Sequence, residues 1–287
     1  MRVLVVGGTG TVGSAVVNQL LARGHGARVM TRAAGRAASL PAGADRVVGD
    51  LEDPASLPAA FDGVDACFLM APVAENETAR ALAGLEAAKT ATVGALVYLS
   101  VVLPPGSEAI PHFASKIPVE QAVRGSGLAW TILRPNNFFQ NDRWFREAIT
   151  TFGVYPQPLG PRGLNRVDVR DIAEAAVNAF ARDGGAGTVS LNGPRGMTGE
   201  DTARIYGELV GRTVRYGGDD LDVWAHQAAA VYPARMVAEL RVMYDYFIRC
   251  GAHGSGRDFA AQEALLGHAP RAFEAYAAEL VKGWRGC

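Results

Sequence analysis

The chain has 287 residues, of which 49% are hydrophobic and 20% are charged, and its formal net charge is −1. These values are typical of globular proteins, and the length suits one large domain or a domain with a smaller lobe. The near-zero net charge argues against nucleic acid or an anionic membrane as a partner.

Three cysteines, Cys67, Cys250 and Cys287, are too few and too scattered for a disulfide framework or a zinc site, so no metal is expected. We read no signal peptide after Met1 and no uninterrupted apolar run of about 18 residues that would span a bilayer. We therefore expect a cytoplasmic monomer or homodimer that acts on a small neutral or weakly charged molecule.

Short apolar segments alternate with helical patterns through the first two thirds of the chain. They cover residues 2–6, 27–31, 44–49, 65–70, 94–100 and 129–134. Between the first two, Val16, Val17, Leu20 and Leu21 recur at helical spacing, and Gly24 stands where a helix would end. Strands that are apolar throughout are buried on both faces. The pattern thus predicts an α/β fold with a doubly wound, parallel Rossmann sheet.

The alternation of strand-like and helical patterns is interrupted near residue 136, where an aromatic and proline-rich segment begins. One more regular unit follows at 166–180 with a strand at 188–192, and its helix is predicted to be capped by Asp171. We predict a Rossmann domain of residues 1–135 plus about 165–192. A smaller, mostly helical substrate lobe of about 136–164 plus 193–287 would lie over the carboxyl edge of the sheet.

A glycine motif directly follows the first strand, in "VLVVGGTGTVGSAVV". Gly7, Gly10 and Gly13 have the spacing G-x-x-G-x-x-G, at the opening of the first helix. There the backbone can approach a pyrophosphate closely and helix amides can bind it, so we predict a dinucleotide site; an ordinary glycine-rich turn is the alternative. The intervening residues Thr9, Thr11 and Val12 are predicted to contact the cofactor too.

Arginine stands at the end of the second strand, where an NAD-selective protein carries an acid for the ribose hydroxyls. Arg32 takes that place and Arg36 follows. Because a guanidinium can pair with a 2′-phosphate, we predict NADP(H) as cofactor; two solvated loop arginines are the alternative.

Two further strand ends are predicted to line the cofactor. Asp50, followed by Leu51, is placed to accept from the adenine amino group, although a helix N-cap is an equal alternative for Asp50. Ala71 and Pro72, after the fourth strand, are predicted to run beside the cofactor as backbone.

Several segments together resemble the atypical short-chain dehydrogenase/reductases, and within them the NmrA-like branch with isoflavone-reductase-type enzymes and NAD(P)H:quinone reductases. They are "GGTGTVG" (7–13), "YLSVV" (98–102), "HFASKIPVEQAVRGSGLAWTILRPNNFFQN" (112–141), "VDVRDIAEAAVNAF" (167–180), "LNGPRGMTGEDTARIYGELVGRTVRY" (191–216) and "LLGHAPRAFEAYAAELVKGW" (265–284). The resemblance implies an NADP-binding fold that often reduces a carbonyl, enone or quinone, without implying one substrate.

Typical members of that superfamily use a Tyr-x-x-x-Lys pair with a serine upstream. Ser100, His112 and Lys116 take the three places, so the tyrosine is absent. Lys116 is one of only three lysines beside 25 arginines, and an ammonium can bond both hydroxyls of the nicotinamide ribose. We predict Lys116 as a cofactor clamp that also stabilises negative charge on the substrate; a solvated lysine is the alternative.

The roles of His112 and Ser100 stay open at this point. His112 is a candidate proton donor, a water-orienting group or a mere occupant of the tyrosine position, and it lies on a loop if the helix with Pro118 begins as late as Ser115. Ser100 is a candidate hydrogen-bond donor to a substrate oxygen, or else bonds its own backbone.

After the sixth strand, Pro135 and Asn136 resemble the family's turn that meets the nicotinamide carboxamide. Phe138, Phe139 and Trp144 are predicted to wall a flat apolar substrate pocket, with the lobe core as the alternative. The sequence thus predicts an NADPH-dependent reductase of a flat aromatic ketone, enone or quinone. A non-catalytic NADP(H) sensor and a non-redox dehydratase or cyclase are the rival hypotheses.

Overall fold

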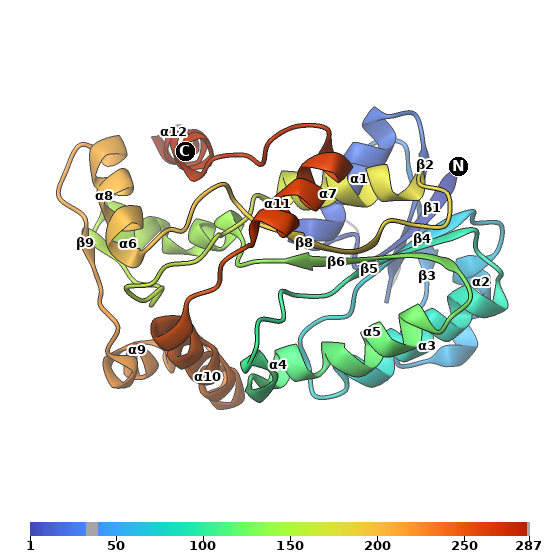
Figure 1. Ribbon diagram of the computed structural model, residues 1–287, viewed down its shortest axis with the longest axis horizontal. Coiled ribbons are helices and arrows are strands. Elements are labelled where there is room, and N and C mark those ends of the chain that lie inside the picture. Colours follow the sequence, from blue (N-terminus) through green and yellow to red (C-terminus); the bar gives the residue numbers. More distant parts are fainter. Residues whose placement is uncertain (33–39, 286–287) are drawn as a thin grey trace.

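Seven parallel strands form the central sheet of the computed structural model, which describes residues 1–32 and 40–285 (Figure 1). They are β1 (Arg2–Val6), β2 (Gly26–Thr31), β3 (Ala44–Val48), β4 (Ala66–Leu69), β5 (Ala95–Leu99), β6 (Ala129–Pro135) and β8 (Gly187–Leu191). Their order, β3-β2-β1-β4-β5-β6-β8, reverses direction between β1 and β4. The predicted doubly wound Rossmann sheet is confirmed, and the reversal marks the place where such sheets bind ligands.

Helices cover both faces of this sheet because successive strand residues point to opposite sides. Val3 and Val5 of β1 pack toward α1 (Thr11–Ala22) and α7 (Val169–Phe180). Leu4 and Val6 pack on the opposite face, toward α2 (Leu57–Phe61), α3 (Glu77–Thr90) and α5 (Lys116–Arg124). Figure 1 shows these two helical layers on either side of the strands. Both faces of the central strands β1, β4 and β5 are therefore dry, as their continuous apolar runs predicted, whereas the edge strand β3 has no buried residue.

Several of the remaining elements form a second, aromatic core. They are the short strands β7 (Val154–Tyr155) and β9 (Arg215–Tyr216), the 3₁₀ segment η4 (Phe139–Phe145) and the helices α6 (Arg146–Thr150), α8 (Gly199–Val210), α9 (Leu221–Ala228), α10 (Ala234–Cys250) and α12 (Phe273–Arg285). Inside this core Arg166 and Asp142 form a fully buried ion pair, with Nη2 2.7 Å from Oδ1. Tyr206 also donates to Asp142, at 3.0 Å.

One helix of the predicted small lobe packs elsewhere. Helix α11 (Gly256–Leu266) lies on α7 and β8, and its Leu265 and Leu266 join the core beside the sheet. The alanine-rich pattern of this region predicts a helix but does not indicate which layer the helix joins.

The helix cap predicted at Asp171 is wrong. Asp168 is the N-cap of α7 and accepts from the amide of Arg170 at 2.8 Å. Asp171 lies inside the first turn, where its carboxylate is buried and paired with Arg271. Burial raises the pKa of Asp171 despite that arginine.

Within the described parts of the chain, we find no helix that is both long and apolar enough to cross a membrane.

Candidate active site

The glycine loop between β1 and α1 has the tight geometry that a pyrophosphate site needs. Gly7 has a φ of +77°, which favours glycine, and its carbonyl accepts from the amide of Gly10 at 2.9 Å. A Cβ on Gly13 would lie 2.2 Å from that same carbonyl oxygen. The third glycine is therefore required for the helix to pack against the loop.

The amino end of α1 is left open for an anion. Gly10 is its N-cap, so no side chain caps the helix, and its first turn carries no acidic residue. The first amides of a helix lack partners within the helix and carry its positive dipole end. A phosphate is the natural acceptor for them.

A cavity of about 300 Å³ adjoins this loop at the carboxyl ends of β1, β2 and β3. Seven of the predicted cofactor residues line it: Gly7, Thr9, Gly10, Arg32, Asp50, Leu51 and Pro72. Thr11 and Gly13 start the helix and do not line the cavity, and Arg36 lies outside the described residues. Asp50 is not a helix N-cap; its Oδ1 accepts from the amide of Glu52 at 3.0 Å.

Arg80, on α3, also lines this cavity and escaped the sequence reasoning. Its Nη2 lies 2.5 Å from Oε1 of Glu52, whereas its buried Nε has no hydrogen-bond partner among the described residues. Buried polar groups without a partner are rare, so this donor indicates an absent acceptor. The open helix end, the glycine cradle and this orphaned donor fit an NAD(P) dinucleotide.

A second cavity, of about 450 Å³, continues from the first and shares Met70 and Pro72 with it. Its lining includes ten of the predicted residues: Val12, Ala71, Pro72, Ser100, His112, Lys116, Pro135, Asn136, Phe138 and Trp144. The far wall comes from α10 and the segment before it, with Tyr232, Met236, Leu240, Met243, Tyr244 and Phe247. A dinucleotide on the glycine loop would therefore extend into a largely apolar chamber.

Phe139 does not line this chamber, so the prediction for that residue is wrong. Its side chain is 1% exposed, and its ring stacks on Tyr276 and meets Phe273 edge to face, with centroids 5.6 and 5.2 Å away. Phe138 and Trp144 both line the chamber, and Trp144 is 81% exposed. Phe138 and Phe139 thus lie on opposite sides of the same chain segment.

His112 lies on a short helix of its own, α4 (Pro111–Ala114), and α5 begins at Lys116. The break at Ser115 arises because Pro118 has no amide hydrogen for the carbonyl of Ala114. Burial, aided by the charge of Lys116, lowers the pKa of His112 to about 4, although Glu239 opposes this shift. The imidazole is therefore neutral at pH 7.

Lys116 is buried, which rules out the solvated-lysine alternative. Its ammonium forms an ion pair with Oε1 of Glu77, the first residue of α3, and lies 5.9 Å from the ring centroid of Tyr98. The other oxygen of Glu77 accepts from the hydroxyl of Ser115 at 2.9 Å. Glu77 is 39 residues from Lys116, and no feature of the sequence signals the pair.

Ser100 donates its hydroxyl proton away from the chamber, to Oε1 of Glu120 at 2.7 Å, rather than to its own backbone. Glu120 is buried and also accepts from Arg134 and Arg124, at 2.5 and 2.7 Å. Burial alone would raise the pKa of Glu120, but the hydrogen bonds from Arg134 and Ser100 hold it below its usual range. Ser100 is thereby left to accept a hydrogen bond from a ligand.

Asn136 is 2% exposed, and its amide is engaged by the protein. Its Nδ2 donates to Asn192 and to the carbonyl of Ala252, both at 3.1 Å, and its Oδ1 accepts from the amide of Asn137 at 2.8 Å. The side chain therefore positions the turn after β6.

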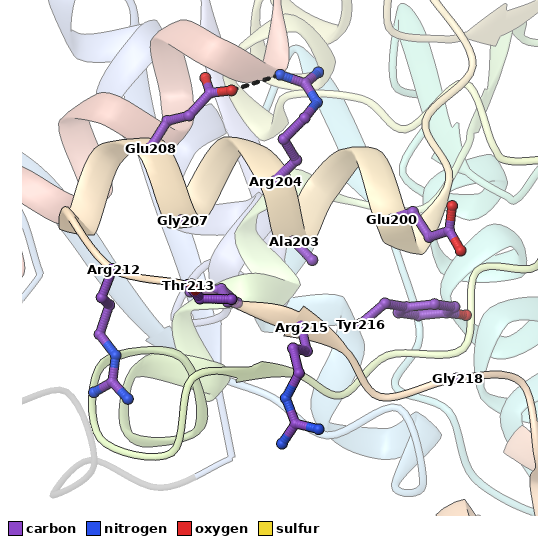
Figure 2. A pocket seen from close by; sticks show the side chains of 11 residues that line it. Glu200, Ala203, Arg204, Gly207, Glu208, Arg212, Thr213, Arg215, Tyr216 and Gly218 are labelled. Carbon is purple, nitrogen blue, oxygen red and sulfur yellow. Dashed lines mark hydrogen bonds and ion pairs between the residues drawn. The ribbon is translucent and has the colours of Figure 1, made fainter.

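Another hollow of about 790 Å³ lies on the surface between α8 and β9 (Figure 2). Within this hollow the guanidinium of Arg204 is paired with Glu208. None of the predicted site residues lines the hollow. The strand ends and the glycine loop adjoin the 300 and 450 Å³ cavities instead.

Comparison with known proteins agrees with this geometry. The model of the NmrA-like family matches residues 1–277. The chain is 36% identical over 221 residues to the NAD(P)H azoreductase of Xenophilus azovorans, covering 75% of this chain and 76% of the relative. It is 30% identical over 279 residues to a Streptomyces griseus (4-alkanoyl-5-oxo-2,5-dihydrofuran-3-yl)methyl phosphate reductase, covering 96% and 97%.

Solved structures show the same fold at lower sequence identity. The NADPH complex of the quinone oxidoreductase QOR2 from Escherichia coli superposes with a TM-score of 0.83 at 22% identity, covering 98% of this chain and 99% of the other. The triphenylmethane reductase of Citrobacter sp. superposes with a TM-score of 0.84 at 22% identity, covering 98% and 100%.

Proposed function

Since the chain belongs to the NmrA-like family and is an NAD(P)H-dependent oxidoreductase, we propose that it uses NADPH to reduce a flat aromatic ketone, enone or quinone. The observation that carries the proposal is the junction of the two cavities at Met70 and Pro72. The cavity beside the glycine loop thus adjoins an apolar chamber, which is the arrangement that hydride transfer to a bound molecule requires.

The preference for NADPH rests on the cations of the first cavity. Arg32 follows β2 at the position where an acid would select NADH, and Arg80 offers a buried Nε without an acceptor among the described residues. Guanidinium groups pair well with phosphates because the planar fork of N–H donors matches the spacing of two phosphate oxygens. A 2′-phosphate supplies such oxygens, and a 2′-hydroxyl does not.

The protein's own residues bind, orient and shield the reactants. When bound, the nicotinamide ring supplies the hydride. Lys116, anchored by Glu77, is placed to bond the ribose hydroxyls, and Ser100 accepts from a ligand hydroxyl or amide. The aromatic and methionine side chains of the chamber exclude water and favour a flat, apolar acceptor.

The protonation states favour an acceptor that forms a delocalised anion. His112 is neutral at pH 7, the proton of Ser100 is donated to Glu120, and burial raises the pKa of Tyr244 to about 12. None of these three groups is a strong acid near neutral pH. A reduced quinone or enone spreads its negative charge and can take its proton from water after release, whereas the localised alkoxide from a simple ketone needs an acid at hand in the chamber.

Oxidation of NADPH, followed by its absorbance, tests the proposal on matched panels of aromatic ketones, enones and quinones. We expect turnover with quinones and enones to exceed that with simple ketones. Tight NADPH binding without turnover of any acceptor would support a sensor instead. Product formation without cofactor oxidation would support a dehydratase or cyclase.

The cofactor preference has its own test. Arg32→Ala is expected to weaken NADPH binding by about 10-fold or more and to leave NADH binding unchanged, because it removes a cation that only the 2′-phosphate uses. Arg204→Ala, in the separate surface hollow, is the control. Equal loss of affinity for both cofactors in Arg32→Ala would overturn the preference.

A further inference from the structure

The substrate chamber is lined by one charged side chain. Among the described residues that line it, only Lys116 is an Arg, Lys, Asp or Glu, and His112 is neutral at pH 7. The charge that a substrate meets therefore depends on how completely Lys116 is neutralised.

Glu77 supplies that neutralisation from behind the chamber wall. Its carboxylate is 1% exposed, does not line the chamber, and holds the ammonium of Lys116 with one oxygen and the hydroxyl of Ser115 with the other. The next residue, Thr78, donates to the carbonyl of Ser115 at 2.9 Å. Two consecutive residues of α3 thus hold the α4–α5 junction, so the carboxylate of Glu77 stays beside the ammonium of Lys116.

The other charged groups near the chamber lie outside its lining and are paired with each other. Glu120, behind Ser100, is paired with Arg134 and Arg124. Glu239 of α10, which acts on His112, is paired with Arg235 at 2.8 Å. Tyr98, below Lys116, is a phenol whose pKa is raised by burial, and it stays uncharged. None of the side chains of Glu120, Arg134, Arg124, Glu239, Arg235 and Tyr98 lines the chamber.

We infer that Glu77 determines substrate charge selectivity: by cancelling Lys116 it makes the chamber electroneutral and restricts the enzyme to uncharged acceptors. An anionic acceptor that entered this apolar chamber would lose its hydration and meet no uncompensated cation, which is unfavourable. An uncharged aromatic acceptor loses little hydration and gains the apolar contacts. This inference rests on the proposed reductase function and narrows its substrate class.

The test compares one naphthoquinone with the same quinone carrying a single ring sulfonate, in mildly acidic buffer that keeps amines protonated. The measured quantity is the ratio of kcat/KM for the sulfonate to that for the neutral quinone. We expect the wild-type ratio to be well below one. Glu77→Gln should raise it between about 10- and 100-fold, because one uncompensated ammonium a few ångströms away then attracts the sulfonate.

Two further variants control the interpretation. Glu86→Gln removes a carboxylate from the solvent-exposed Glu86–Lys89 pair on the same helix and should leave the ratio unchanged. Adding Lys116→Gln to Glu77→Gln should return the ratio to its wild-type value, since both charges are then gone. Lys116→Gln alone leaves a bare carboxylate and should favour a trimethylammonium-substituted quinone, which provides a second test if Glu77→Gln does not fold.

The inference and the proposed function fail in different ways. A wild-type enzyme that prefers the sulfonate, or a Glu77→Gln variant that turns over both quinones at the wild-type ratio, would overturn the inference and leave the reductase intact. A wild-type enzyme that oxidises NADPH with no uncharged acceptor would overturn the proposed function itself.

Discussion

The half-buried imidazole of His112 makes the stability of the protein depend on pH, and a substitution of this one residue tests that dependence. Burial lowers its pKa from 6.5 to about 4 in the folded protein. Between these two values the unfolded chain binds a proton that the folded chain does not bind. The stabilisation is therefore fully present above about pH 6.5 and is lost as the pH falls toward 4.

The linkage relation gives the size of this effect. With the two pKa values above, protonation of the unfolded state costs the folded protein about 2 kcal/mol at pH 5 and about 3 kcal/mol at pH 4. Other groups titrate in the same range, so only a difference between two proteins is informative. His112→Gln keeps a polar side chain of similar size that does not titrate.

Urea unfolding of the cofactor-free wild type and of His112→Gln at pH 7, 5 and 4 measures this difference. Between pH 7 and pH 4 the free energy of unfolding of the variant should increase by about 3 kcal/mol relative to that of wild type, so that the variant becomes the relatively more stable protein. If the two proteins lose stability in parallel over this range, then His112 is not buried as a neutral imidazole, and the account of the missing proton donor falls with it.

Three pairs of substitutions test the loop, the chamber wall and the lobe core. Gly13→Ala should abolish NADPH binding in a fluorescence titration, because its Cβ would lie 2.2 Å from the carbonyl of Gly7, whereas Gly283→Ala, with open space around it, should bind normally. In thermal and urea unfolding, Phe139→Ala should lower the free energy of unfolding by about 3–5 kcal/mol, because this side chain is buried. Trp144→Ala, at an exposed position, should change the free energy of unfolding by under about 0.5 kcal/mol and raise KM for aromatic acceptors. The opposite pattern would place Phe139 in the chamber. Asp142→Asn leaves the fully buried Arg166 unpaired and should cost about 3–5 kcal/mol in urea unfolding, against less than about 1 kcal/mol for Asp222→Asn at the exposed pair with Arg241.

Most of the cofactor site follows from local patterns and one rule of topology. The residues Gly7, Arg32, Asp50 and Ser100 each follow an apolar strand closely in the sequence. Parallel strands bring their carboxyl ends to the same edge of a sheet, so these positions meet once the sheet is recognised. The orphaned donor of Arg80 was missed because α3 contributes it from within a helix, where no motif marks it.

The choice between neighbours along the chain required the three-dimensional structure. Phe138 and Phe139 carry the same side chain, and only the path of the segment after β6 decides that one lines the chamber and the other joins the core. Ser100 is likewise a plausible donor in sequence, and only its contact with Glu120 shows where its proton goes.

The amino-acid sequence by itself determined the sheet, the glycine loop and the cationic position after β2, because hydrophobic period, glycine spacing and strand ends are local properties. Only the tertiary structure decided the electrostatics of the chamber. The partners that set it, Glu77 with Lys116 and Glu120 with Ser100, come from different elements 39 and 20 residues apart. Whether a buried charge is cancelled or left open depends on which helix turns face each other, and packing of the whole fold settles that.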